Sequence, residues 1–412
     1  MRPPFSPPAR AADLFWAGVN RVLLSPVFES DRYFEHRGIH FACLSLYNVR
    51  MNYSFDSWLK QLGWNTYFQA NYETMQTTGT IPARVSSESK GLYQLLTPQG
   101  EMSARLTGKM RYEQAPATIF PAVGDWVMAM PIAGEDKAMI HAVLPRKSKF
   151  SRKVAGECAA EQVVAANVDF VFIVSGLDGG RSFNLRRIER YLTLAWNSGA
   201  VPVVILNKAD MVESVETFIQ EVEGIAPGVS VHPVSARTGA GLEALLAYLT
   251  EGSTIGFLGS SGVGKSALIN ALLGKNKQAV GDVRLDDRMG RHTTTRRELI
   301  PLPGGGIVID TPGMREIQMW GADSDLDGVF SDISQIAEDC RFKDCSHTSE
   351  TGCAVLAAVE RGDLDPARLE NYRKLQKELE YVGAREADSA RQYEKMKFKP
   401  IAKLVKQLYK ER

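Results

Sequence analysis

Two short motifs stand in an order that restricts what this chain can fold into. Residues 259–266 read GSSGVGKS and fit the pattern G-x-x-x-x-G-K-S/T of a phosphate-binding loop. An apolar run over residues 253–258 precedes the loop, and apolar residues at helical spacing follow it over 267–273. A glycine-rich turn that matches by chance is the alternative, and the strand, loop and helix in sequence argue against it. The unusual fact is that residues 207–210, NKAD, which ordinarily follow such a loop, precede it here.

The residue types of this loop suit phosphate binding. Glycines let the backbone curl so that successive N–H groups face phosphate oxygens, Lys265 reaches the terminal phosphates, and Ser266 offers a hydroxyl to Mg²⁺. Because Lys265 stabilises charge on the transferred phosphate, it is also a candidate catalytic residue. The phosphate-binding candidates are Gly259, Ser260, Ser261, Gly262, Val263, Gly264, Lys265, Ser266 and Ala267.

The NKAD motif predicts that the bound base is guanine. The apolar run 201–206 reads as a buried parallel strand that delivers the motif to the carboxyl edge of a sheet, where open α/β sheets place ligands. Asp210 can accept both the ring N–H and the exocyclic amino group of guanine, a donor pair that adenine lacks, with discrimination on the order of 10⁴ in a desolvated site.

Four residues alone could instead cap a helix, and a second motif favours base binding. Residues 234–236, VSA, end another β-rich run, and in proteins of this kind the backbone amide of such a triplet contacts the base carbonyl. The base-binding candidates are Asn207, Lys208, Ala209, Asp210, Ser235 and Ala236.

Two further elements follow the phosphate loop. Asp310 leaves the apolar run 307–309 and opens DTPG, where its carboxylate can hold Mg²⁺ through water and the Gly313 N–H can meet the terminal phosphate. Between them, residues 290–295 read GRHTTT and could supply a second Mg²⁺ hydroxyl from Thr294 or Thr295, between which the sequence does not choose. An ordinary solvated loop is the alternative for this segment.

Along the chain, the two base-binding motifs come first, and the phosphate loop, the threonine segment GRHTTT (the threonine switch) and the DTPG motif (the aspartate switch) follow them. In an ordinary small GTPase, the phosphate loop and the two switches come before the base-binding motifs. Both orders can build one doubly wound sheet, because the termini of such domains lie at the surface and cutting an exposed loop is tolerated. The sequence therefore predicts a circularly permuted GTPase domain, whose aspartate switch is tied directly to whatever follows it.

A cluster of cysteine and histidine follows the aspartate switch. Its spacing is C-x4-C-x-H-x5-C, and three thiolates with one imidazole suit a closed tetrahedral site for one structural Zn²⁺ ion. Four protein ligands leave no open position, which argues against a catalytic zinc. Disulfides are the alternative, but no convincing secretory signal is present and a nucleotide switch indicates a cytoplasmic protein. The candidate ligands are Cys340, Cys345, His347 and Cys353.

Together these motifs resemble the ribosome small subunit-dependent GTPase family, RsgA or YjeQ. The similarity runs from about residue 59 to 381 and includes residues 167–169, the segment NLRRIERYL at 184–192, the four nucleotide motifs and the zinc cluster with Phe342 and Asp344 between its cysteines. The resemblance implies a monomeric, non-membrane assembly factor that binds the small ribosomal subunit and its rRNA late in maturation. It also implies that the factor hydrolyses Mg²⁺-bound GTP to GDP and phosphate, that the ribosome stimulates this reaction, and that hydrolysis releases the factor from the subunit.

The segment before the GTPase motifs predicts a small closed β-barrel. Five short alternating runs lie between residues 80 and 144, broken by Gly and Pro turns. By analogy with the family this is an OB-fold, whose open face often binds nucleic acid, although the sequence does not separate it from an SH3-like barrel.

The predicted organisation is multidomain. Residues 1–77 form an N-terminal extension, 78–148 the OB-fold-like barrel, 149–322 the α/β P-loop GTPase domain with permuted motif order, and 323–412 the zinc-binding helical module with a basic tail. Residues 1–50 are expected to come from an upstream start assignment, because the family-like sequence begins after Met51. The partly apolar stretch 14–28 is too short to span a membrane.

RNA binding must rest on local basic patches, because the net charge is only +1. One patch is the tail, residues 391–412. The other, the junction patch, consists of Arg146, Lys147, Lys149, Arg152 and Lys153. A solvated helix and a solvated linker are the alternatives.

The residue after the DTPG glycine predicts slow intrinsic turnover. Many GTPases have a Gln there that orients the attacking water, whereas Gly313 is followed by Met314. His292 is the nearest polar candidate for a catalytic role if docking on the subunit orders its loop, and contact with solvent or RNA phosphate is the alternative. Two other function classes stay open: a zinc-stabilised RNA-binding GTPase switch that signals to a protein partner, and a zinc-stabilised RNA-binding protein in which GTP only locks the structure.

Overall fold

The computed structural model describes residues 55–75, 77–112, 120–153, 161–179, 182–274, 297–302, 305–310 and 326–384. Several predictions concern other residues: the extension 1–50, His292, Thr294, Thr295, Gly313 and the basic tail lie outside the described residues. None of the helices in the described ranges combines the length and apolar character needed to cross a bilayer.

The predicted barrel is confirmed, and its strand order is that of an OB-fold. Two helices, α1 (Phe55–Gln61) and α2 (Thr66–Met75), precede it, and its strands are β1 (Ile81–Ser89), β2 (Leu92–Thr97), β3 (Gly100–Leu106), β4 (Trp126–Pro131) and β5 (Lys137–Val143). The pairing order β1-β2-β3-β5-β4 closes through β1 and β4, with β3 and β5 parallel. A short helix, α3 (Gly108–Tyr112), lies between β3 and β4. Alternating side chains such as Val85, Leu95 and Ile140 fill the interior.

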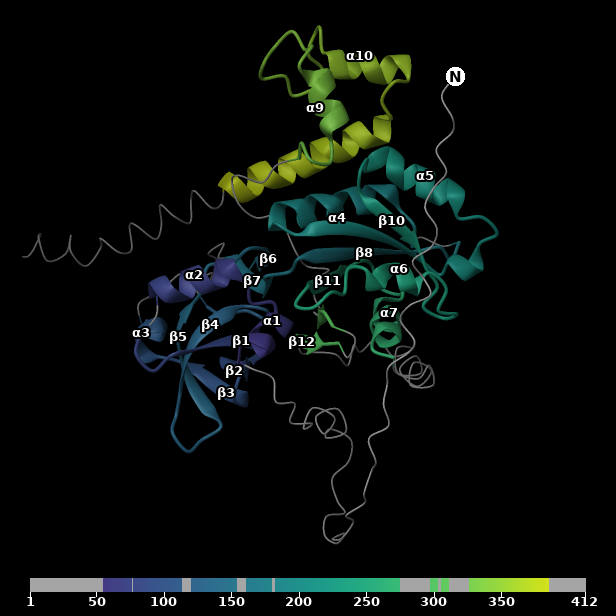
Figure 1. The fold of residues 1–412 in the computed structure, drawn as a ribbon. Coiled ribbons are helices and arrows are strands. Elements are labelled where there is room, and N and C mark those ends of the chain that lie inside the picture. The colour runs from purple at the N-terminus through teal and green to yellow at the C-terminus, as the bar shows by residue number, and fades with distance from the viewer. Residues whose placement is uncertain are drawn as a thin grey trace, which may run out of the picture. The chain divides into compact units, whose positions relative to one another are not determined.

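The second half of the sheet has the topology of a doubly wound α/β domain (Figure 1). The strands β8 (Phe170–Gly176), β9 (Val201–Asn207), β10 (Ser230–Pro233), β11 (Thr254–Leu258) and β13 (Ile307–Asp310) are parallel, and β12 (Glu298–Pro301) is antiparallel to β13. Their spatial order is β10-β9-β8-β11-β13-β12. The strand before the phosphate loop, β11, therefore lies between strands that precede it in sequence and strands that follow it.

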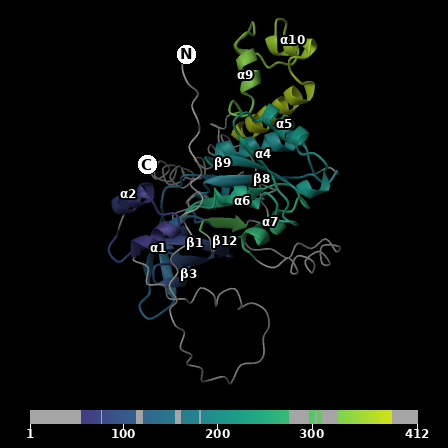
Figure 2. The same ribbon diagram turned by 45° about the vertical axis from the view of Figure 1, so that its right-hand side comes forward.

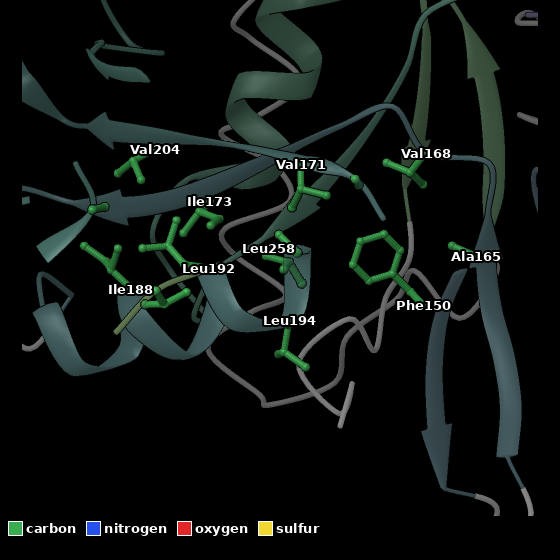
Figure 3. Packing of buried hydrophobic residues seen from close by; sticks show 14 of the residues in the cluster. Phe150, Ala165, Val168, Val171, Ile173, Ile188, Leu192, Leu194, Val204 and Leu258 are labelled. Atoms are coloured by element: carbon green, nitrogen blue, oxygen red, sulfur yellow. The ribbon is translucent and has the colours of Figure 1, made fainter. Parts of the chain in front are cut away.

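Both faces of this sheet are buried, which explains the near-continuous apolar runs of its strands. On one face Val171, Ile173 and Val204 pack with Ile188 and Leu192 of α4 (Leu185–Ser198), as Figure 3 shows. A second cluster, on alternate residues of the same strands, packs with α6 (Leu242–Leu246) and α7 (Lys265–Leu272); it includes Phe172, Val203, Leu245 and Leu268. Helix α5 (Glu216–Ile225) connects β9 to β10.

The barrel and the GTPase sheet are joined by backbone pairing and by one buried arginine. The pair Ser87↔Glu298 connects β1 to β12. The Arg84 guanidinium, fully buried, donates to the Asn167 carbonyl at 3.3 Å and to the Thr254 hydroxyl at 2.9 Å, at the start of β11. Burial lowers the pKa of Arg84 to about 10, so it remains charged at neutral pH. The core is continuous across this junction, and the exact domain boundaries remain predictions.

The junction patch is built into the structure rather than carried on a linker. Lys149 and Arg152 lie on β6 (Lys149–Lys153), which forms an antiparallel hairpin with β7 (Glu161–Ala166). The Arg146 guanidinium donates to the buried Asp125 carboxylate at 2.8 and 2.7 Å. Lys147 lies with its ammonium 5.8 Å from the centre of the Tyr67 ring.

The C-terminal module is helical, as predicted, and is attached to the GTPase domain through α4. It contains α9 (Ser331–Ala337), α10 (Ala354–Arg361) and a helix over residues 366–384. This last helix lies beside α4 in both views (Figures 1 and 2). Arg190 of α4 donates to Glu378 at 2.7 Å, and buried Glu189 accepts from Arg368 and Asn371.

Candidate nucleotide site and metal cluster

The NKAD motif leaves the end of β9 and connects the two halves of the site. Asn207, buried at the strand end, donates from Nδ2 to the Val263 carbonyl at 2.8 Å and accepts at Oδ1 from the Ala236 amide at 3.1 Å. Lys208 then adopts a left-handed conformation with φ of 65°, which turns the chain sharply. The predicted strand edge thus brings NKAD, the phosphate loop and the VSA triplet together, and Asn207 is the residue that links them.

The carboxylate expected to read the base is held in place. Asp210 lies in a short 3₁₀ turn, η3 (Ala209–Met211), and its Oδ1 accepts from the hydroxyl of buried Ser235. Its Oδ2 accepts from Arg237. The hydrogen bond from Ser235, followed by the contact with Arg237, lowers the pKa of Asp210, so the carboxylate is ionised at neutral pH.

The phosphate loop has the backbone that its glycines predict. Gly259 has a φ of 149°, and a Cβ there would meet the Val174 carbonyl oxygen at 2.4 Å. Gly264 has a φ of 97°, and a Cβ would meet Asn207 Nδ2 at 2.2 Å. Both positions therefore require glycine. Lys265, the first residue of α7, donates from Nζ to the carbonyls of Gly259 and Ser260, both at 2.7 Å, so its ammonium lies over the loop.

Asp310 ends β13, the parallel neighbour of β11, and so reaches the same edge of the sheet as the phosphate loop. Burial raises the pKa of this carboxyl, the charge of Lys265 opposes that shift, and the charge of Glu298 adds to it. Glu298 pairs with Asp310 across β12 and β13. A partly buried carboxylate near a lysine and beside a phosphate loop is suited to bind a divalent cation.

The four predicted metal ligands come together in the C-terminal module. Their ligand atoms all lie within 4.8 Å of one another. The sulfurs of Cys340 and Cys353 are 3.9 Å apart, and His347 Nδ1 is 3.6 and 3.4 Å from them. A tetrahedral Zn²⁺ site has edges of about 3.8 Å between sulfurs and about 3.5 Å between sulfur and nitrogen. The three printed edges of the cluster match those of a zinc site, and Cys345 lies close enough to serve as the fourth ligand.

Sequence reasoning missed two contacts at the base site. Lys208 pairs with Asp178, which follows β8, and Arg237 pairs with Asp210. Nothing in the local pattern of either residue marks these pairs, because each joins loops that only the sheet topology brings together. In the sequence, only family resemblance marks the segment 184–192, whereas in the structure its charged residues hold the C-terminal helix.

The fold and the site define the class of protein. A central strand carries the phosphate loop, the strands that carry the NKAD and VSA motifs precede it in the chain, and the strand bearing Asp310 follows it. This is the arrangement of a circularly permuted P-loop GTPase.

Comparison with known proteins agrees with this class and gives the family. The "RsgA GTPase" family model matches residues 143–320. The small ribosomal subunit biogenesis GTPase RsgA of Opitutus terrae is 47% identical over 337 residues, which cover 79% of this chain and 91% of that protein. RsgA 2 of Lactiplantibacillus plantarum is 45% identical over 353 residues, 85% of this chain and 98% of that protein. The chain belongs to the RsgA family of GTPases.

Solved structures show the same fold. YjeQ from Thermotoga maritima superposes with a TM-score of 0.55 at 30% identity, over 73% of this chain and 98% of that one. YloQ, described as a circularly permuted GTPase, superposes with a TM-score of 0.52 at 22% identity, over 75% of this chain and 96% of that one.

Proposed function

We propose that this protein hydrolyses GTP as a late assembly factor of the small ribosomal subunit, binding its rRNA and leaving when GTP is hydrolysed. The observation that carries the proposal is the conjunction of the permuted nucleotide site with the 47% identity to a protein named for small ribosomal subunit biogenesis. The factor acts as a cytoplasmic monomer.

In the proposed nucleotide complex, each motif has one role. Asp210 accepts the two N–H donors of guanine, Lys208 and Ala236 flank the base, and the backbone of residues 259–264 faces the phosphates. Lys265 neutralises charge on the terminal phosphates, and Mg²⁺ is held by Ser266 and Asp310. Thr294 or Thr295 supplies the further hydroxyl, and the Gly313 amide meets the terminal phosphate. The Asn207 contacts support this assignment, because they fix the base motif against the phosphate loop.

The metal cluster is proposed to hold one structural Zn²⁺ ion. The close spacing of its four donors and the absence of a free ligand position in a Cys₃His set support a structural role. Cys353 also accepts from the Leu356 amide at 3.4 Å, at the start of α10. Zinc bound there orders the loop 340–353 and the first turn of α10 together.

RNA contact is proposed for the barrel and for the exposed part of the junction patch. Lys147 lies over Tyr67, whose side chain is exposed, and this combination of cation and aromatic ring suits a nucleic acid backbone and base. Arg146 is excluded from that role, because its guanidinium is held by buried Asp125.

His292 is proposed to position the attacking water, since Met314 stands where many GTPases carry a Gln. His292→Ala is expected to lose most subunit-stimulated turnover while GTP affinity and subunit binding remain. Unchanged stimulated turnover would reassign the role to another residue or to the ribosome.

The proposal is tested by subunit association in defined nucleotide states. Purified small subunits are sedimented with the full chain in the presence of GDP, GTP or a non-hydrolysable GTP analogue, at several salt concentrations. We expect the protein to stay on the subunit with the analogue and to leave after GTP hydrolysis. Equal association in all states, or none in any, would argue against an assembly GTPase.

A further inference from the structure

The carboxylate that reads guanine is already paired with a side chain of the protein. Arg237 donates from Nε to Asp210 Oδ2 at 2.9 Å, and its Nη2 donates to the same oxygen. Arg237 follows the VSA triplet directly, so its backbone belongs to the base site. The other carboxylate oxygen accepts from Ser235.

The two N–H donors of Arg237 are arranged like the two N–H donors that guanine offers to a carboxylate. In arginine, Nε–H and Nη2–H are carried on one guanidinium carbon. In guanine, the N1–H and the 2-amino group are likewise carried on one carbon of the ring, and a carboxylate accepts from both. The Arg237 side chain therefore offers Asp210 the donor pair that guanine offers, and the two cannot occupy Oδ2 together.

We propose that Arg237 is an intramolecular competitor of guanine for Asp210, which lowers the affinity of the site for GTP and GDP. This inference rests on the proposed guanine site. Before a nucleotide binds, the pair keeps the ionised carboxylate partnered; on binding, Arg237 must swing away. The measured dissociation constant then equals the intrinsic constant divided by the fraction of molecules in which Oδ2 is open.

Exposure identifies Arg237 as the partner that moves. Its side chain is 77% exposed, whereas that of Asp210 is 15% exposed. Ser235 is buried, and its hydroxyl also accepts from the Thr238 amide at 3.1 Å. Because the arginine can exchange its carboxylate for water at little cost, its competition is worth only about twofold to fivefold in affinity, the range of an exposed ion pair.

The test compares GDP and ADP binding by the full chain and two variants, Arg237→Ala and Arg237→Gln. Both variants should bind GDP about twofold to fivefold more tightly than the wild type. Their affinity for ADP should not change, because adenine lacks the donor pair that Asp210 accepts. The gain should shrink at high salt, because screening weakens the pair in the wild type. A matched control, Arg361→Ala, removes an arginine of similar exposure that pairs with Asp363, and should leave both affinities unchanged.

Unchanged or weaker GDP binding by the Arg237 variants would overturn the inference, as would an equal gain in the Arg361 control. These results differ from failure of the guanine site itself. If the wild type bound ADP as well as GDP, the proposed site would be wrong. A wild type that prefers GDP, with variants that gain nothing, would reject only the competition by Arg237.

Discussion

Arg368, on the helix over residues 366–384, donates from Nη1 to Oε1 of Glu189 on α4 at 2.7 Å, and the Glu189 side chain is fully buried. Arg186 donates to the same carboxylate, and Asn371 donates to its second oxygen at 2.6 Å. Burial alone raises the pKa of Glu189, and the two arginines and Asn371 oppose that effect. The C-terminal module is thus attached to the GTPase domain through a buried carboxylate that needs partners of opposite charge.

Removing one partner of this pair should be costly. Arg368→Met removes one of the three donors to the buried Glu189 carboxylate and also takes this arginine from Asp332 and the Val329 carbonyl, and we expect a loss of about 3–5 kcal/mol in the free energy of unfolding. Chemical denaturation measures that loss. Limited proteolysis should cleave the C-terminal module of the variant earlier than that of the wild type, because the helix over residues 366–384 detaches from α4. Lys374→Ala, which breaks an exposed pair with Glu370, serves as the control and should cost about 1 kcal/mol or less. Equal effects of the two variants would contradict the role given to Glu189.

Nucleotide choice should depend on Asp210. Asp210→Asn replaces an acceptor by a donor, so the preference is expected to shift from guanine to xanthine nucleotides, which carry a carbonyl in place of the amino group. Competition binding with GDP, XDP and ADP measures the shift. Wild-type protein that binds ADP and GDP equally well would reject the guanine assignment.

The pH dependence of GDP binding should reveal the environment of Asp210. Its pKa lies below the usual value, chiefly because of the hydrogen bond from Ser235. Because the folded-state pKa is depressed, the stability that the ionised carboxylate confers is complete above the ordinary aspartate pKa and is lost as pH falls from there through the folded-state pKa. Ser235→Ala should raise this pKa, so GDP affinity should begin to fall at a higher pH than in the wild type. Coincident pH profiles would show that Ser235 does not tune the carboxylate.

Zinc should hold the C-terminal module together without taking part in chemistry. Metal-binding free energy at such sites is folding free energy, about 10 kcal/mol or more in small zinc modules. Chelation or Cys345→Ser should therefore unfold the residues after about position 325, as followed by hydrogen exchange, while GDP binding remains largely intact. Freshly purified protein that contains no zinc and still has a folded module would refute this prediction.

The nucleotide site was predictable because its signals are local. Apolar runs mark β9 and β11, and each motif follows directly at the end of its strand, so topology alone brings Asp210 and Lys265 to one edge of the sheet. The metal cluster is local in the same sense, since its ligands lie within one short segment. Alternation of apolar residues likewise predicted the barrel.

What could not be predicted depends on pairing between distant residues. The barrel is an OB-fold because β3 pairs in parallel with β5, as in Ala104↔Ala138, and no local pattern separates that choice from an SH3-like barrel. Charge counting placed Arg146 in an RNA-binding patch, whereas its partner Asp125 is buried beneath it. Glu189 and Arg368 are 179 positions apart, and only the folded chain shows that they meet.

GTP turnover with and without purified small ribosomal subunits, at several salt concentrations, tests the account most directly. The protein alone should turn over slowly, because Met314 cannot orient water, and subunits should stimulate it by about tenfold or more, with the stimulation declining as salt weakens RNA contacts. Lys265→Ala, which lacks the ammonium over the phosphate loop, should show no turnover under either condition. Wild-type turnover that is the same with and without subunits at every salt concentration would contradict the proposal that this GTPase acts on the small subunit.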